Sequence, residues 1–223
     1  ALYTAFWAVG ALKGLGLAVP DSARTVEWIR SQQRTRDGIG GFALSDDYFN
    51  YSSAAGTYFG MAALSLLGAA PERPEGVRGF LLSSFGQEPD GGFELGHGDN
   101  WNNYDHYSRM HDTFCAVEAL ALTGHPLSDS DTSRAARPAA DCAAWIAGCQ
   151  NADGGFGRFG VTDQTPLLPA SEMLPTWSAV MALARLGAVI PRPARPEAPV
   201  REFAAHDPLH RHPVVDHSDP CEV

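Results

Sequence analysis

The sequence predicts an all-α fold with two concentric layers of helices, an α/α toroid, and two observations support this prediction. Four apolar runs rich in Ala and Leu each end at a glycine, and they alternate with segments that are apolar on one side only. A Gly-Gly-Phe triplet recurs three times between these segments. Helices that are apolar all round belong inside a fold, whereas one-sided helices belong on its surface. We therefore expect about four helical hairpins, each with an inner and an outer helix.

The four apolar runs are the expected inner helices, at residues 4–16, 57–68, 113–124 and 176–187. Each run ends in glycine, which readily adopts the left-handed conformation that follows many helix C-termini. Because apolar residues occupy every side of these runs, we expect the inner helices to be buried on every side.

The outer helices are expected at residues 22–33, 74–85, 134–149 and about 197–205. Val77, Phe80 and Leu81 show the i, i+3, i+4 spacing of an amphipathic helix. Four hairpins leave the inner helices at the two ends of the row with one uncovered apolar side. Such faces usually mark an interface, so we expect a homo-oligomer or a partner subunit unless the C-terminal tail folds back over the gap.

A glutamine and an aspartate precede each Gly-Gly-Phe triplet: Gln33 and Asp37, Gln87 and Asp90, Gln150 and Asp153. This loop, the aromatic residues near the start of each inner run and the Ala-Leu pattern resemble the repeat of protein prenyltransferase β subunits and class II terpene cyclases. The resemblance covers about residues 1–206 and implies the α/α toroid. Relatives have six hairpins, so the four found here imply a ring that is open, shortened or completed by another chain. Residues 207–223 are expected to form a separate His- and Pro-rich tail.

The composition excludes two classes of partner. A formal charge of −10 and one lysine among 16 basic residues argue against nucleic acid and against an anionic membrane surface. The apolar first nineteen residues contain Lys13 and three glycines, so no membrane span is expected. Cys142 and Cys149 lie two helical turns apart, too far for a disulfide, which indicates reduced thiols and a cytoplasmic protein.

His111 and Asp112, at the start of the third inner helix, are the catalytic candidates. In the class II cyclases that the chain resembles, the motif is Asp-x-Asp-Asp-Thr. Asp112 matches its last Asp, His111 stands where an Asp donates the initiating proton, and Arg109 replaces the first Asp. An adjacent acid can orient an imidazole and raise its proton affinity. The alternative is that Asp112 caps this helix and His111 is its hydrogen-bonded neighbour.

The same segment also resembles the prenyltransferase pattern His-Thr-Cys-Tyr-Cys-Leu, in which His111 falls on the zinc-ligand histidine. The two other ligands of that pattern would fall on Ala55 and Thr57, so no zinc site is expected. The polar loop before this helix holds His97, Asp99, Asp105 and His106, but their spacing specifies no metal.

Aromatic side chains are the candidate substrate-binding groups, because aromatic rings stabilise cations through their negative faces. The candidates are Trp7, Tyr58, Trp101, Tyr104, Phe114 and Trp177. The alternative is that aromatic residues at helical spacing are simply part of the core.

These observations favour a terpene-cyclase-like enzyme that binds an isoprenoid or polyene in a central aromatic cavity and promotes proton-initiated cyclisation or isomerisation. A prenyltransferase-like enzyme is the first alternative, but a prenyl diphosphate needs clustered Arg, Lys or metal. A non-catalytic toroid that binds a lipid or a partner protein is the second. We expect a hydrophobic small molecule as the ligand and no cofactor.

Overall fold

The computed structural model describes residues 1–34, 40–44, 52–85, 91–93, 108–131, 137–158 and 170–191. These residues contain seven α-helices, and their only β pairings are isolated bridges. The helices are α1 (Leu2–Gly14), α2 (Ser22–Ser31), α3 (Ala54–Leu66), α4 (Pro74–Ser83), α5 (Met110–Leu122), α6 (Pro138–Gly148) and α7 (Met173–Arg185).

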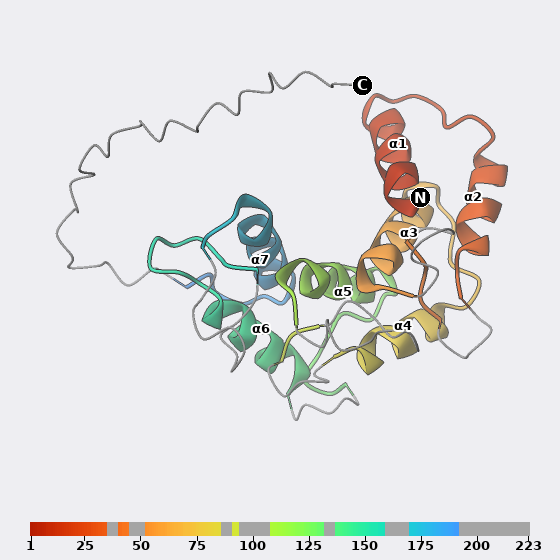
Figure 1. The fold of residues 1–223 in the computed structure, drawn as a ribbon. Helices are drawn as coiled ribbons and strands as arrows, with labels where there is room; N and C mark the ends of the chain where they lie inside the picture. The colour runs from red at the N-terminus through yellow and green to blue at the C-terminus, as the bar shows by residue number, and fades with distance from the viewer. Residues whose placement is uncertain are drawn as a thin grey trace, which may run out of the picture.

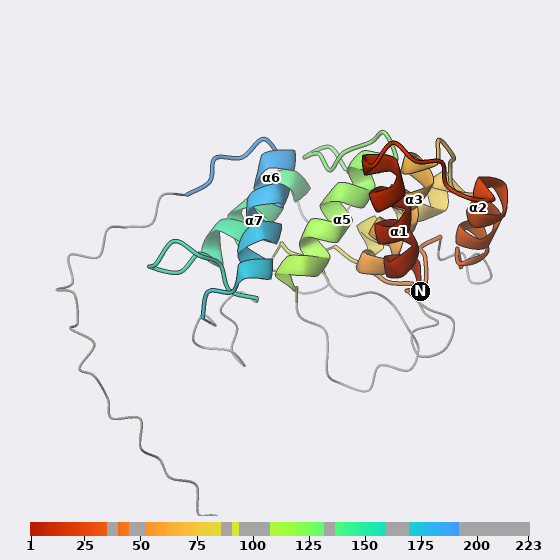
Figure 2. The same ribbon diagram turned by 90° about the horizontal axis from the view of Figure 1, so that it is seen from above.

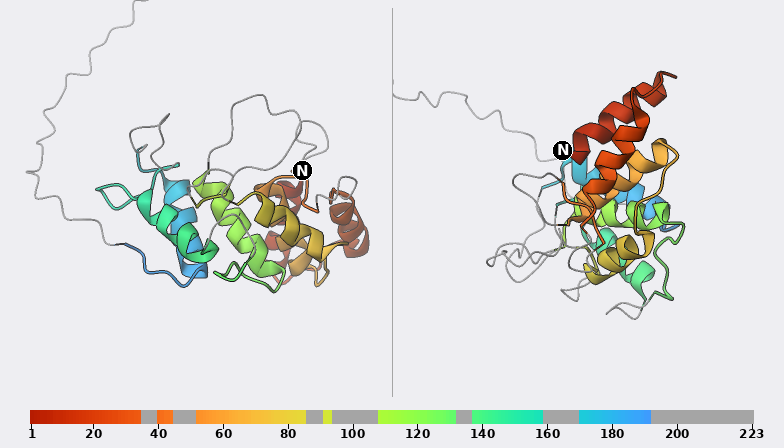
Figure 3. Two further views of the ribbon diagram at one scale, coloured as in Figure 1. Left: turned by 90° about the horizontal axis from the view of Figure 1, so that it is seen from below. Right: turned by 90° about the vertical axis from the view of Figure 1, so that its right-hand side faces the viewer.

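The helices form two layers of an open arc (Figure 1). Helices α1, α3, α5 and α7 line the inner side of the arc, and α2, α4 and α6 lie outside them. Each inner helix packs against the next, α1 on α3, α3 on α5 and α5 on α7. Figures 2 and 3 show the same row from above and from below. The predicted all-α toroid is confirmed, while the expected outer helix at 197–205 and the tail lie outside the described residues.

The inner helices begin two or three residues before the predicted runs, and each has 13 residues. The predicted C-terminal glycines are confirmed, because Gly16, Gly68, Gly124 and Gly187 all have positive φ angles. The third outer helix begins at Pro138 rather than at residue 134. Proline at the first helical position fits this start, because its fixed φ and missing N–H cost nothing there.

Burial differs along the row of inner helices. Ten residues of α3 and ten of α5 are buried, but only five of α7 and two of α1 are. The prediction that every inner helix is buried on every side is therefore wrong for α1 and α7. Each of these has an inner-helix neighbour on one side only among the described residues, so Trp7 of α1 is 57% exposed.

The Gly-Gly-Phe loops join the layers. The Phe42, Phe93 and Phe156 side chains are buried, and each loop leads into the inner helix that follows it. The amide of Gln33 donates to the carbonyls of Gly40 and Arg73, at 2.8 and 3.0 Å, and so ties the first loop to the start of α4. A Cβ on Gly40 would lie 2.0 Å from the backbone of Gly76 in α4, so this contact requires glycine.

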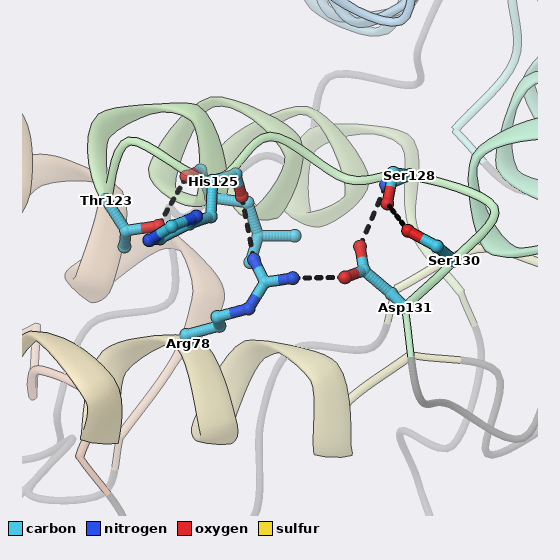
Figure 4. A network of polar contacts seen from close by, with 7 residues as sticks. Arg78, Thr123, His125, Ser128, Ser130 and Asp131 are labelled. Atoms are coloured by element: carbon cyan, nitrogen blue, oxygen red, sulfur yellow. Dashed lines mark hydrogen bonds and ion pairs between the residues drawn. The ribbon is translucent and has the colours of Figure 1, made fainter.

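A polar network fixes the segment that follows α5 to the outer layer (Figure 4). The Arg78 guanidinium of α4 donates to the backbone carbonyl of His125 at 2.7 Å and pairs with the carboxylate of Asp131. Asp131 also accepts from the backbone N–H of Ser128 at 2.8 Å. This network holds residues 125–131, which follow α5, against α4.

Helices long and apolar enough to cross a membrane are absent from the described residues. Cys115, Cys142 and Cys149 are buried thiols.

Candidate functional site

A row of aromatic rings crosses the four inner helices. Because each inner helix has 13 residues, equivalent positions can be compared directly, and the fifth residue is aromatic in all four: Phe6, Tyr58, Phe114 and Trp177. Their ring centroids are 5.9, 5.3 and 4.7 Å apart in successive pairs. These separations are those of interacting aromatic pairs, so the four rings form one continuous aromatic row.

The aromatic row contains three of the six predicted substrate-binding residues: Tyr58, Phe114 and Trp177. Trp7 lies one position further along α1, and its ring centroid is 5.0 Å from that of Phe6. Phe6 is thus the row member that the predicted substrate-binding set leaves out. Trp101 and Tyr104 lie outside the described residues, as do His97, Asp99, Asp105 and His106.

The residue before each ring in α3, α5 and α7 explains how the row is positioned. It is a threonine whose hydroxyl accepts a hydrogen bond from the backbone N–H of the preceding loop phenylalanine. The three bonds join Thr57 to Phe42, Thr113 to Phe93 and Thr176 to Phe156, at 3.0, 3.0 and 2.9 Å. Neighbouring helical residues point about 100° apart, so a threonine held toward the loop fixes the direction of the next side chain, whose ring meets a ring of the neighbouring inner helix.

His111 lies in the first turn of α5, one helical turn before Cys115. Its Nε2 atom is 3.6 Å from the Cys115 Sγ atom, and its ring centroid is 6.2 Å from that of Phe114. The Nδ1 atom is buried and has no hydrogen-bond partner among the described residues. His111 therefore extends the aromatic row on α5 with an imidazole that has one nitrogen available for hydrogen bonding.

Asp112 is buried and lies three residues after Arg109, the N-cap residue of α5. It is thus in the first helical turn rather than at the cap position itself. The helix places Asp112 and His111 on different sides, because consecutive residues do not face each other.

Burial sets the protonation of the groups around His111. It lowers the pKa of His111 from its usual value near 6.5, so the neutral imidazole dominates at pH 7. Burial also raises the pKa of Cys115 well above its usual range, and the carboxylates of Asp112 and Glu118 add to this effect. Cys115 is therefore a protonated thiol and not an activated nucleophile.

A charged pair lies two turns further along α5 and was not predicted. The Arg185 guanidinium of α7 donates two hydrogen bonds to the Glu118 carboxylate, at 2.9 and 2.8 Å. Glu118 is buried. Burial of the Tyr58 phenol, with smaller contributions from Cys115 and Glu118, raises the pKa of Tyr58 to about 12. The sequence signal was the single charged residue in each of these two apolar runs, Glu118 in 113–124 and Arg185 in 176–187.

The described residues contain no group of three side chains suited to hold a metal ion. The two positions aligned with zinc ligands fit this result, because Ala55 has no ligand atom and the Thr57 hydroxyl accepts from the loop at Phe42.

Comparisons with known proteins agree with this architecture. The model of the prenyltransferase α/α-toroid domain matches residues 1–196. Among solved structures, the chain is similar to protein geranylgeranyltransferase-I of Candida albicans in complex with GGPP, with a TM-score of 0.56 and 16% identity. That match covers 75% of this chain and 46% of the other, so this chain spans less than half of the length of its structural neighbour. No curated protein sequence matches the chain. Because the family model matches well over half of the chain, the chain belongs to the prenyltransferase α/α-toroid family.

Proposed function

We propose that the chain binds an isoprenoid along the aromatic row, as a toroid of the prenyltransferase type. The observation that carries this proposal is the presence of an aromatic ring at the same position of all four inner helices. Phe6, Tyr58 and Trp177 keep part of their surface accessible and can offer an extended hydrocarbon apolar contacts, while the buried Phe114 links them. The structural neighbour was solved with GGPP, which supports an isoprenoid as the ligand class.

The transferase class has better support than the terpene-cyclase class that the sequence favoured. The family model and the structural neighbour are both of the prenyltransferase type. Proton-initiated cyclisation also needs a protonated acid, and the lowered pKa of His111 removes its proton at neutral pH. The neutral imidazole is suited to accept a proton or a hydrogen bond, a role that fits activation of an acceptor group for prenyl transfer.

The binding test measures affinity for an isoprenoid by calorimetry. Geranylgeraniol carries the hydrocarbon alone, and geranylgeranyl diphosphate adds the charged group. We expect Trp177→Ala to weaken the binding of both ligands by about tenfold, which corresponds to the 1.4 kcal/mol of a strong aromatic contact.

The matched control for this test is Trp28→Ala, which removes a partly exposed indole from the outer helix α2. It should leave both affinities unchanged. Equal losses in the two variants, or binding of inorganic diphosphate alone, would contradict a hydrocarbon site on the aromatic row.

The chemical role of His111 has its own test, a proton NMR titration of the histidine resonances with His111→Gln as the assignment control. We expect the His111 imidazole to titrate below pH 6.5, because burial disfavours its charged form. A pKa above 7 would instead make His111 a proton donor at neutral pH. That result would favour proton-initiated cyclisation over prenyl transfer.

A further inference from the structure

An arginine of an outer helix holds the segment that follows each of the inner helices α3 and α5. The Arg30 side chain of α2 donates from Nε to the backbone carbonyl of Ala70, after α3, at 2.9 Å. The Arg78 side chain of α4 donates to the backbone carbonyl of His125, after α5, at 2.7 Å (Figure 4). In both cases the arginine belongs to the outer helix that precedes the inner helix in sequence.

Helix α7 is held differently at its C-terminal end. The outer helix before it, α6, contains no arginine or lysine between Pro138 and Gly148. Instead Arg185, the last residue of α7, reaches the inner helix α5, where its Nε and Nη2 atoms donate to the two carboxylate oxygens of Glu118. Two parallel hydrogen bonds from a planar guanidinium fix direction as well as distance. Glu118 and Arg185, the charged pair, thus anchor α7 within the inner layer.

The charged pair is the second of two fixed points on α7. At the other end of the helix, the Thr176 hydroxyl accepts from the backbone N–H of Phe156 at 2.9 Å. One fixed point lets a rigid helix pivot, whereas two set its direction. Small side chains form shallow ridges that resist sliding and rotation weakly. Such residues are buried on α7 between the two points: Ser178, Ala179 and Ala182.

The direction of α7 matters for the aromatic row. Trp177 is 48% exposed, and its ring centroid is 4.7 Å from that of Phe114 in α5, with an interplanar angle of 64°. The charged pair joins the same two helices, with Glu118 four residues after Phe114 and Arg185 eight residues after Trp177. At these spacings each charge lies on the same face of its helix as the ring. A change in the direction of α7 would therefore change the distance and angle between the two rings.

We propose that Glu118 and Arg185 are positioning residues for the isoprenoid site. Their two hydrogen bonds set the direction of α7 against α5 and so hold the Trp177 indole in the aromatic row, where it meets the ligand. The proposal rests on the isoprenoid binding proposed above. Stability alone explains the pair poorly, because replacing a buried ion pair by apolar residues often leaves a protein equally stable or more stable.

The first measurement needs no ligand and follows the fluorine NMR signals of protein labelled with fluorotryptophan. The variant Glu118→Met with Arg185→Met removes both charges and both hydrogen bonds but keeps apolar side chains at the two positions. We expect the Trp177 signal, identified by Trp177→Phe, to shift or broaden. The signal of Trp28 in the outer helix α2 should stay in place. A Trp177 signal that also stays in place would overturn the proposal.

The second measurement is the affinity for geranylgeraniol, by calorimetry. The variant with both methionines should bind up to about tenfold more weakly, which is the loss expected for Trp177→Ala itself. Adding Trp177→Ala to that variant should cause little further loss, because the pair acts through the indole. The control is Arg137→Met, which removes an exposed arginine paired with Asp129 at the start of α6. It should leave the affinity unchanged.

Urea denaturation separates positioning from stability. If the variant with both methionines unfolds more easily, Glu118→Gln replaces it in both measurements, because it keeps the side-chain shape and leaves the half-exposed Arg185 in contact with water. An unchanged affinity, or a loss that adds in full to that of Trp177→Ala, would overturn the positioning role and leave isoprenoid binding intact. An unchanged chain that binds no geranylgeraniol would overturn this proposal and the proposed function together.

Discussion

The helices α5 and α1 are alike in sequence and different in surroundings. Both are inner helices of 13 residues, and both are apolar on all sides. Ten residues of α5 are buried against two of α1, because α5 lies between two inner helices and α1 packs against one. An apolar sequence thus marks a helix as belonging to the inner layer, but its neighbours determine how much of it is buried.

The first prediction tests this contrast within the aromatic row, where the largest effect is expected. Phe114 of α5 is 2% exposed and Trp177 of α7 is 48% exposed. Phe114→Ala should lower the free energy of unfolding by about 3–5 kcal/mol through lost contacts and a cavity. Trp177→Ala should cost roughly 1–2 kcal/mol, since half of its surface is already in water. Urea denaturation followed by circular dichroism measures both.

Equal losses of stability in these two variants would break the comparison. They would mean that the inner helix at the end of the row is covered in solution as fully as the one in the middle.

The second prediction concerns the threonines that receive the loop phenylalanine N–H. Thr113→Val keeps the shape of the buried side chain but leaves the N–H of Phe93 without its acceptor. Such a loss in a buried place costs about 1–3 kcal/mol. Thr176→Val breaks the equivalent bond to Phe156 at a half-buried position, where water can replace the hydroxyl.

We therefore expect Thr176→Val to cost less than Thr113→Val in the same denaturation experiment. Amide hydrogen exchange adds a local measurement, because the Phe93 N–H should lose protection in Thr113→Val. Unchanged protection in that variant would show that the threonine hydroxyl is not needed to hold the loop.

The two layers of the fold could be predicted because the same pattern, an apolar helix followed by a one-sided helix, recurs several times along the sequence. Three loops and four apolar runs predicted the four inner helices and the three described outer helices to within a few residues at most boundaries. The burial of α1 could not be predicted in the same way, since a helix sequence does not say which neighbours it has. The expectation that every inner helix is buried on every side therefore does not hold for α1, which packs on one inner helix among the described residues.

The candidate site was predicted only in part. Aromatic residues were visible, but choosing Phe6 rather than Trp7 requires a register that only the equal helix lengths provide. The adjacent pair His111 and Asp112 suggested a direct partnership, whereas the described neighbour of the imidazole is Cys115, four residues on. Glu118 and Arg185 are 67 residues apart in sequence, so local sequence patterns could not predict that they form an ion pair.

The last prediction has the smallest effect and asks whether the contrast between covered and open positions also holds in the outer layer. Gly76 and Gly79 lie one turn apart in α4. A Cβ on Gly79 would meet no atom within 4 Å, whereas a Cβ on Gly76 would lie 3.0 Å from the backbone of Gly40. Glycine within a helix costs about 0.5–1 kcal/mol relative to alanine, so Gly79→Ala should stabilise the protein by about that amount. Gly76→Ala should lose this gain and destabilise the protein, because the loop backbone must move. Thermal unfolding of the two variants measures the difference in stability. A gain of stability in both would show that the backbone at Gly40 can move away from α4 at little cost in free energy.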